Sequence, residues 1–170
     1  MIRLMGAVLL TGGAALLGLC AVRHMNSRVN DLRYLIKGLE SMVRELTYRL
    51  APLPELLQFA QAQTEGRVAM FFDLCAQGAE HLNGRSFQTV WDQAAEASQM
   101  RLEQPDLQCL EQLGGVLGRY DGDSQQKALE TAAARLEEQR SLAEEQSRRL
   151  GKVYSVLGLT AGAFLMILLI

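Results

Sequence analysis

Few residues in this 170-residue chain have the types and spacing that catalysis or metal binding requires. The two histidines, His24 and His81, are distant in sequence and form no local pair for a metal ion or a catalytic triad. Residues 121–125 begin like a calcium-binding loop. That loop requires Gly at its sixth position and Glu at its twelfth, where this chain has Gln126 and Ala132. We therefore expect no enzymatic activity, no metal site and no cofactor.

Other patterns that carry chemistry are also missing from the sequence. There is no G-x-x-x-x-G-K-[ST] phosphate-binding loop, and the net charge of −2 gives no basic surface for nucleic acid. The three cysteines, Cys20, Cys75 and Cys109, have no C-x-x-C spacing, which argues against a zinc site or a thioredoxin-like motif. We expect the latter two to be buried structural thiols. Glu45 lies near Tyr48 beside an apolar stripe, where an ion pair at a helix end is a simpler explanation than catalysis.

The elements that would position any site are helices. Apolar residues in the middle of the chain recur at intervals of three and four, which is typical of amphipathic helices. The first such stripe consists of Leu32, Leu35, Leu39, Met42, Leu46 and Leu50. Pro52 and Pro54 end this helix and begin the next. Further helices are predicted over 54–60, 68–82, 86–94, 105–117 and from 124 onward. The predicted fold class is all-α, a bundle of about six helices.

Three local features predict how these helices pack. Trp91 is expected in the core rather than in contact with a ligand. Gly114 and Gly118 are four residues apart and are predicted to share one helix face, where small residues let another backbone approach closely. That backbone belongs either to the same bundle or to a partner helix. Asp123, with Gln126 three residues later, resembles a capping box at the start of the last helix.

The two ends of the chain are apolar and free of charge. Segments 4–22 and 153–170 contain no Asp, Glu, Lys or Arg. As helices they would each extend about 27–28 Å, close to the ~30 Å hydrocarbon core of a bilayer. A cleaved signal peptide is the alternative for the first segment, but the residues around Cys20 do not form an A-x-A-like cleavage site. We therefore expect two retained transmembrane helices.

Basic residues near these two segments predict the orientation of the chain. Eight of them flank the middle of the chain: Arg23, Arg28, Arg33, Lys37, Arg140, Arg148, Arg149 and Lys152. Only Arg3 and the amino terminus lie on the other side. The expected organisation of this integral membrane protein is a transmembrane helix at 1–22, a cytoplasmic helical domain at 23–152 and a second transmembrane helix at 153–170.

A series of short motifs runs along the whole chain. In order, they are Gly6, Glu45-Leu46-Thr47-Tyr48, Pro52-Leu53, Phe71-Phe72, Trp91, L-G-G-V-L-G-R-Y-D at 113–121, S-Q-Q-K at 124–127, Leu157-Gly158, Gly162 and Ile167-Leu168-Leu169. Their order and spacing resemble the stage III sporulation protein AB family, and 113–121 is the most specific stretch. Ala51 departs from the family, which often has Thr before the proline, and this puts a capping hydroxyl at that position in doubt.

The resemblance implies both a fold and a role. The soluble part of the family resembles the cytoplasmic F domain of type II secretion and type IV pilus platform proteins. By resemblance, the chain is a platform component of the channel complex that links mother cell and forespore during endospore formation. It would lie in the outer forespore membrane on the mother-cell side. The implied partners are the secretion-type ATPase of the complex, stage III sporulation protein AA, and the other subunits. Homo-oligomerisation is left open, and no nucleic acid is expected.

Two stretches are expected to form the partner-binding or fold-defining region: the helix end at 45–53 and the turn at 118–127. They combine glycines that allow close approach, turn and capping groups, and glutamines in a first helical turn, where side chains often project into solvent. They are also the stretches that match the family best. The candidate residues are Glu45, Tyr48, Pro52, Leu53, Gly114, Gly118, Asp121, Gln125 and Gln126.

Two other functional classes remain open from the sequence. One is a membrane-anchored helical regulator or receptor scaffold unrelated to secretion, which a pocket with convergent polar groups would favour. The other is a transporter or channel subunit. Two membrane helices without internal charge cannot line a polar path alone, which argues against that second class.

Overall fold

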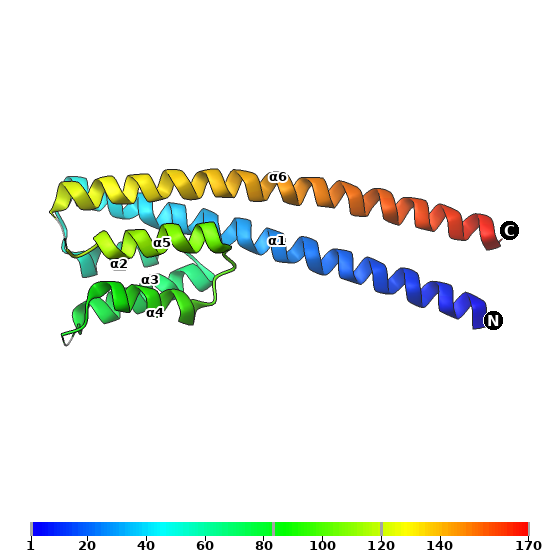
Figure 1. Ribbon diagram of the computed structural model, residues 1–170, viewed down its shortest axis with the longest axis horizontal. Coiled ribbons are helices and arrows are strands. Elements are labelled where there is room, and N and C mark those ends of the chain that lie inside the picture. Colours follow the sequence, from blue (N-terminus) through cyan, green and yellow to red (C-terminus); the bar gives the residue numbers. More distant parts are fainter. Residues whose placement is uncertain (1, 83, 120, 170) are drawn as a thin grey trace. The chain divides into compact units, whose positions relative to one another are not determined.

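The computed structural model is all-α, as predicted, with six helices among the described residues and no strand there (Figure 1). It describes residues 2–82, 84–119 and 121–169, with side chains described for 26–82, 84–119, 121–151 and Val153. The helices are α1 (Ile2–Arg49), α2 (Leu53–Ala62), α3 (Gly66–Glu80), α4 (Phe87–Ser98), α5 (Gln104–Val116) and α6 (Gly122–Leu169).

The chain forms two compact units. One unit comprises Met1–Ser27 with Leu142–Ile170, and within it the Ser147 hydroxyl donates a hydrogen bond to Asn26 Oδ1 at 2.9 Å. The other comprises Arg28–Ser141 and contains α2 to α5 with the adjoining parts of α1 and α6. We call this second unit the helical unit. It lies within the predicted central domain, 23–152.

The predicted membrane spans are not supported. Residues 4–22 and 153–169 are helical as parts of α1 and α6, but all of the side chains of the two predicted spans, except that of Val153, lie outside the described residues. Where side chains are described, no helix is long and apolar enough to cross a membrane. A span needs about 20 consecutive apolar residues, whereas charged residues interrupt the described parts of α1 and α6 at intervals of five residues or fewer. This finding overturns the expected two-span localisation in the outer forespore membrane with a cytoplasmic domain.

The leucine stripe of α1 forms one side of the core of the helical unit. The buried members of the stripe are Leu32, Leu35, Leu39, Met42 and Leu46, as their spacing predicted. Leu50 was predicted to continue the stripe and does not. The helix ends at Arg49, and Leu50 is turned into the left-handed region with a φ of 49°. Its side chain is therefore directed away from the core and is largely exposed.

An aromatic cluster around Trp91 fills the centre of the helical unit. The indole is fully buried, meets Phe71 edge-on with ring centroids 4.7 Å apart, and donates a hydrogen bond from Nε1 to the Leu110 carbonyl oxygen at 2.9 Å. A Cβ added to Gly114 would lie 2.5 Å from Trp91 Cδ1. Gly114 therefore allows α5 to pack against the indole. The close approach predicted for this glycine is made inside the bundle.

A buried polar network joins α1 to the start of α5. Asp106 is 0% exposed and accepts two hydrogen bonds from Arg28, at 3.0 and 3.1 Å, and one from the Glu103 backbone N–H at 2.9 Å. One turn further along α1, Asp31 accepts hydrogen bonds from the Arg101 backbone N–H at 2.7 Å and from Arg67 at 3.3 Å. Each of these two buried carboxylates is thus compensated by a cation and by a backbone donor.

Candidate protein-binding site

Arg49 connects the end of α1 to α2. Within α1 it forms the ion pair predicted for Glu45, whose Oε2 lies 3.4 Å from Arg49 Nε. The Arg49 guanidinium also lies over the ring of Phe59 in α2, 5.7 Å from the centroid. Glu45 Oε2 is itself buried and has no hydrogen-bond partner among the described residues. The contact positions the last turn of α1 and with it the residues that follow.

Two large side chains project into solvent at this helix end. Tyr48 is 84% exposed and Leu50 is 79% exposed, while Ala51 between Leu50 and Pro52 is buried and anchors the segment. A non-glycine residue in the left-handed conformation of Leu50 costs roughly 1–2 kcal/mol. The chain therefore presents an apolar side chain to solvent from a strained backbone, a combination found at binding sites. The apolar spacing of the sequence assigned Leu50 to the core, so its exposure was not predicted; Pro52, two residues later, was the available signal that the helix ends early.

The Gly118 turn packs against the beginning of α2. Gly114 and Gly118 were predicted to share one helix face, and this prediction is wrong. Helix α5 ends at Val116, and Gly118 lies beyond it with a φ of 75°. A Cβ added to Gly118 would lie 3.3 Å from Leu53 Cδ2. The structure thereby brings together Gly118 and Leu53, which come from the two separate stretches expected to form the site.

Asp121 precedes the first residue of α6. Its carboxylate accepts a hydrogen bond from the Ser124 hydroxyl at 2.7 Å, and this bond holds the pKa of Asp121 below its ordinary value. The capping box predicted for Asp123 and Gln126 is wrong, because Asp123 is already inside the helix and Gln126 donates instead to Glu130 at 2.9 Å. The sequence has two aspartates here, Asp121 and Asp123. The residue before the helix is Asp121, whereas the predicted capping box assigned that position to Asp123.

Gln125 connects the first turn of α6 to the Gly118 turn. Its side-chain oxygen accepts a hydrogen bond from the Gly118 backbone N–H at 3.4 Å, and the side chain is half-buried instead of projecting into solvent. Residues 48–53, and residues 117–126 as far as they are described (117–119 and 121–126), thus lie at one end of the helical unit, as Figure 1 shows. We call these two segments the turn end. Two of the nine candidate residues are outside the turn end: Glu45 precedes its first segment by three residues, and Gly114 packs against Trp91.

Reactive groups are not gathered at the turn end. Cys75 and Cys109 are buried as predicted, and burial raises the pKa of both thiols, which keeps them protonated and unreactive. Across the described part of the chain, no group of three or more His, Cys, Asp or Glu side chains could hold a metal ion. The turn end instead has an exposed aromatic side chain, Tyr48, and an exposed aliphatic side chain, Leu50, next to the buried Ala51. Such side chains suit contact with another protein.

Comparisons with known proteins agree with this architecture. The family model described as Stage III sporulation protein AB matches residues 3–170. Stage III sporulation protein AB of Bacillus subtilis (strain 168) is 28% identical over 171 residues, which cover 99% of each chain. A solved structure of Stage III sporulation protein AB matches with a TM-score of 0.63 and 27% identity, over 72% of this chain and 97% of that one. The match along nearly the whole length shows that this chain belongs to the stage III sporulation protein AB family.

Proposed function

We propose that this chain works by binding other proteins in the channel complex between mother cell and forespore, and that the turn end is its docking surface. The observation that carries the proposal is the conformation of Leu50. A strained backbone that holds a leucine 79% exposed beside a tyrosine 84% exposed is difficult to explain by folding alone. Tyrosine is enriched at protein interfaces, where a few such side chains supply most of the binding energy.

The proposed partner is the secretion-type ATPase of the same complex, stage III sporulation protein AA. Two considerations support it. Membership of a sporulation family sets the process in which the chain takes part, and the resemblance of the family to secretion-platform F domains suggests a subunit of an ATPase-driven assembly. A subunit of this kind contributes surfaces and no catalysis, which is consistent with the composition of the turn end.

The experiment is capture of the purified ATPase by the immobilised full-length chain. Two variants remove the exposed side chains, Tyr48→Ala and Leu50→Gly, and Met70→Ala is the matched control, because Met70 is a 49% exposed apolar residue on α3 outside the turn end. Loss of an interface anchor weakens binding by roughly 1–2 kcal/mol, about fivefold to thirtyfold. We expect this loss for both turn-end variants and parental affinity for Met70→Ala.

Leu50→Gly separates binding from folding. Glycine accepts the left-handed φ without strain, so the free energy of unfolding should stay the same or rise by up to about 1 kcal/mol. A variant that is at least as stable as the parent and still binds the ATPase less tightly assigns the leucine to binding. Parental affinity of both turn-end variants, or no capture of the ATPase by the parent chain, would contradict the proposal.

A further inference from the structure

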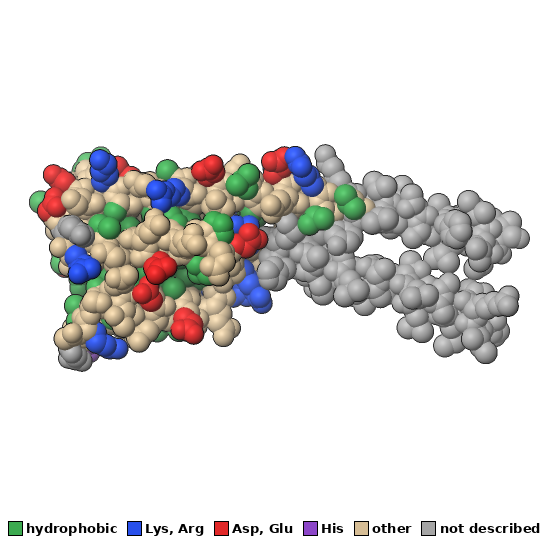
Figure 2. Space-filling view, in the orientation of Figure 1, with side chains coloured by type: hydrophobic (Ala, Val, Ile, Leu, Met, Phe, Trp, Pro, Cys, Tyr) green, Lys and Arg blue, Asp and Glu red, His purple; other side chains and the backbone are tan. Residues whose placement is uncertain are grey.

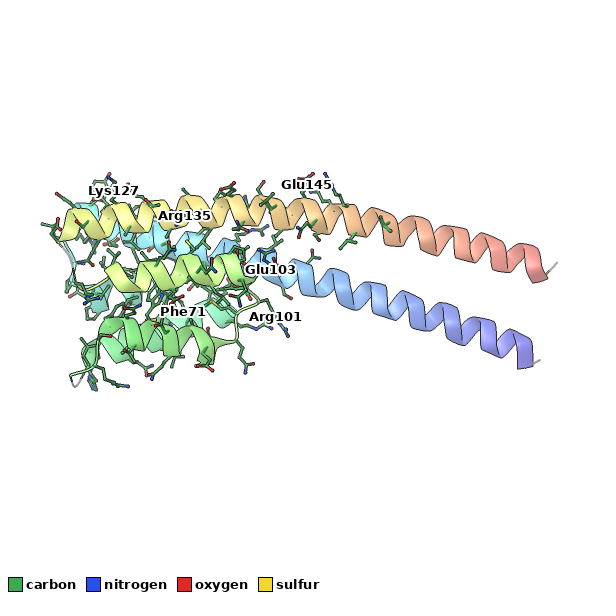
Figure 3. All side chains as sticks on the ribbon, viewed as in Figure 1. Phe71, Arg101, Glu103, Lys127, Arg135 and Glu145 are labelled. Carbon is green, nitrogen blue, oxygen red and sulfur yellow. The ribbon has the colours of Figure 1, made fainter. Side chains whose placement is uncertain are left out.

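A second surface of the helical unit lies between α5 and α6. It is a groove of about 460 Å³ whose apolar walls include Leu113, Val116 and Ala128. Lys127 and Arg135 line the same groove from α6, and both side chains are exposed. Figure 2 shows apolar side chains in the strip between the two helices, and Figure 3 shows Lys127 and Arg135 along α6. The groove thus has an apolar interior and a cationic edge.

The charge of this groove is uncompensated. No carboxylate is among its lining residues, although the chain as a whole has a net charge of −2. Arg135 donates to the neutral side chain of Gln112 at 2.9 Å, and Lys127 forms no ion pair with any described residue. Most cations on protein surfaces need no partner. Two on one edge of an apolar groove, however, select for a ligand that is both apolar and acidic.

The polar groups of the groove argue against a small molecule. A small-ligand site converges several free donors and acceptors on one point. Here the Thr131 hydroxyl donates to the Lys127 carbonyl oxygen at 2.7 Å, and the Ser124 hydroxyl donates to Asp121 at 2.7 Å. These hydroxyls are therefore used inside the chain, and the two cations remain as the charged features that a ligand would meet.

The spacing of the cations matches a helix. Lys127 and Arg135 are eight residues apart, about 12 Å along α6 at 1.5 Å per residue. Two carboxylates seven or eight residues apart on another helix are separated by about 10.5–12 Å. We propose that the α5–α6 groove docks an amphipathic helix of a partner protein, which covers the apolar walls and pairs two such carboxylates with Lys127 and Arg135. This inference shares with the proposed function only the premise that the chain acts by binding proteins.

A second copy of the chain is a poorer occupant than a different protein. Helix α6 does carry Glu130 and Glu137 seven residues apart, with alanines between them. Glu137 is already paired with Arg140 through both carboxylate oxygens, at 2.5 and 2.8 Å, and Glu130 accepts from Gln126 at 2.9 Å. Docking this face into the groove would require breaking interactions that a partner with free carboxylates does not have to break.

The test uses the full chain and two synthetic helical peptides of about 18 residues. Both carry the same leucine and alanine stripe, and one has glutamates at two positions eight residues apart where the other has glutamines. The dissociation constant is measured by fluorescence anisotropy at two salt concentrations. We expect the glutamate peptide to bind at least about fivefold more tightly than the glutamine peptide, with the difference reduced at high salt.

Variants of the chain locate the site of binding. Lys127→Glu should weaken binding of the glutamate peptide about fivefold or more, and Ala128→Gln should weaken both peptides by filling the groove. Lys37→Glu is the control, since it makes the same charge change at an exposed lysine of α1 that does not line the groove. Equal affinities for the two peptides, or parental affinity in Lys127→Glu, would overturn the inference.

Sedimentation of the chain alone tests the alternative occupant. Self-association that disappears in Lys127→Glu would identify a second copy in the groove and overturn the partner version. None of these variants changes Tyr48 or Leu50, so ATPase capture through the turn end is measured independently. The groove inference and the proposed function can therefore fail separately.

Discussion

Arg28 and Asp106 are 78 residues apart in sequence and form a bidentate ion pair in the interior of the helical unit. The Arg28 side chain is 8% exposed and that of Asp106 is 0% exposed. Arg28 also lies 2.9 Å from Glu103, whose backbone N–H donates to Asp106. The planar guanidinium matches the carboxylate in geometry, so the pair fixes the position of α5 on α1 as well as neutralising a buried charge.

Removing one partner of this pair should be strongly destabilising. Arg28→Ala leaves the Asp106 carboxylate buried without its cation, and we expect the free energy of unfolding to fall by roughly 3–5 kcal/mol. The control is Arg149→Ala, which breaks an exposed pair with Glu145 at 2.6 Å and should change stability by less than about 1 kcal/mol. Urea denaturation followed by circular dichroism measures both. Similar losses in the two variants would show that the buried pair is no more important than a surface pair.

Gly114 should not tolerate even one added methyl group. The Cβ of Gly114→Ala would meet the Trp91 ring at 2.5 Å, so either α5 or the indole must move, at about 1–3 kcal/mol. Gly151 offers the matched control within a helix, since a Cβ there would have no neighbour within 4 Å. Gly151→Ala should raise stability by about 0.5–1 kcal/mol through helix propensity. Melting temperatures that move in the same direction would contradict the packing described for Gly114.

Gly118 should be sensitive for a different reason. Its φ of 75° is unfavourable for residues with a Cβ, and Leu53 Cδ2 is already close to the space a side chain would occupy. We expect Gly118→Leu to lower the free energy of unfolding by more than about 1–2 kcal/mol. Gly118→Asn should be milder, because asparagine enters the left-handed region more readily. Thermal melting measures the loss of stability in both variants, and comparing the two losses separates backbone strain from crowding against Leu53. An unchanged melting temperature in Gly118→Leu would rule out both causes.

The Asp121 carboxylate should titrate below its ordinary pKa of 3.8. Because the pKa is lowered in the folded chain, its contribution to stability is present above the ordinary value and is lost as the pH falls through the folded pKa. Ser124→Ala removes the hydroxyl that donates at 2.7 Å and should raise the pKa of Asp121 toward 3.8. Carboxyl chemical shifts followed by NMR between about pH 6 and pH 2 report the titration directly. A pKa that is the same in parent and variant would show that this hydrogen bond is absent in solution.

Local signals predicted most of the fold. The leucine spacing along α1, the prolines at the starts of α2 and α5, and the burial of Trp91 all follow from rules that act over a few residues. The left-handed turn at Leu50 was not predicted, because Leu50 continues the apolar spacing of the stripe although the helix ends at Arg49. The start of α6 was placed too late, because Asp121 and Asp123 are both suitable residues to precede a helix and the sequence does not distinguish them.

Long-range partners were beyond the reach of the sequence. Nothing near Arg28 or Asp106 indicates that they meet, since the pairing depends on how α1 and α5 pack and not on local spacing. The same is true of Leu53 and Gly118, which were named as candidates in separate stretches without any signal that they touch. The charged edge of the α5–α6 groove also requires two helices to be placed side by side. The expected partner-binding role of the candidate residues stays a prediction.

The single tryptophan gives the helical unit a built-in optical probe. Trp91 is fully buried against Phe71 and bonded to the Leu110 carbonyl, so its emission should be blue-shifted in the folded chain and move to longer wavelength when α3, α4 and α5 separate. Circular dichroism, in contrast, is dominated by the long helices α1 and α6. Coincident unfolding curves from the two signals would indicate one cooperative transition, and divergent curves would show the short helices coming apart independently of the long ones.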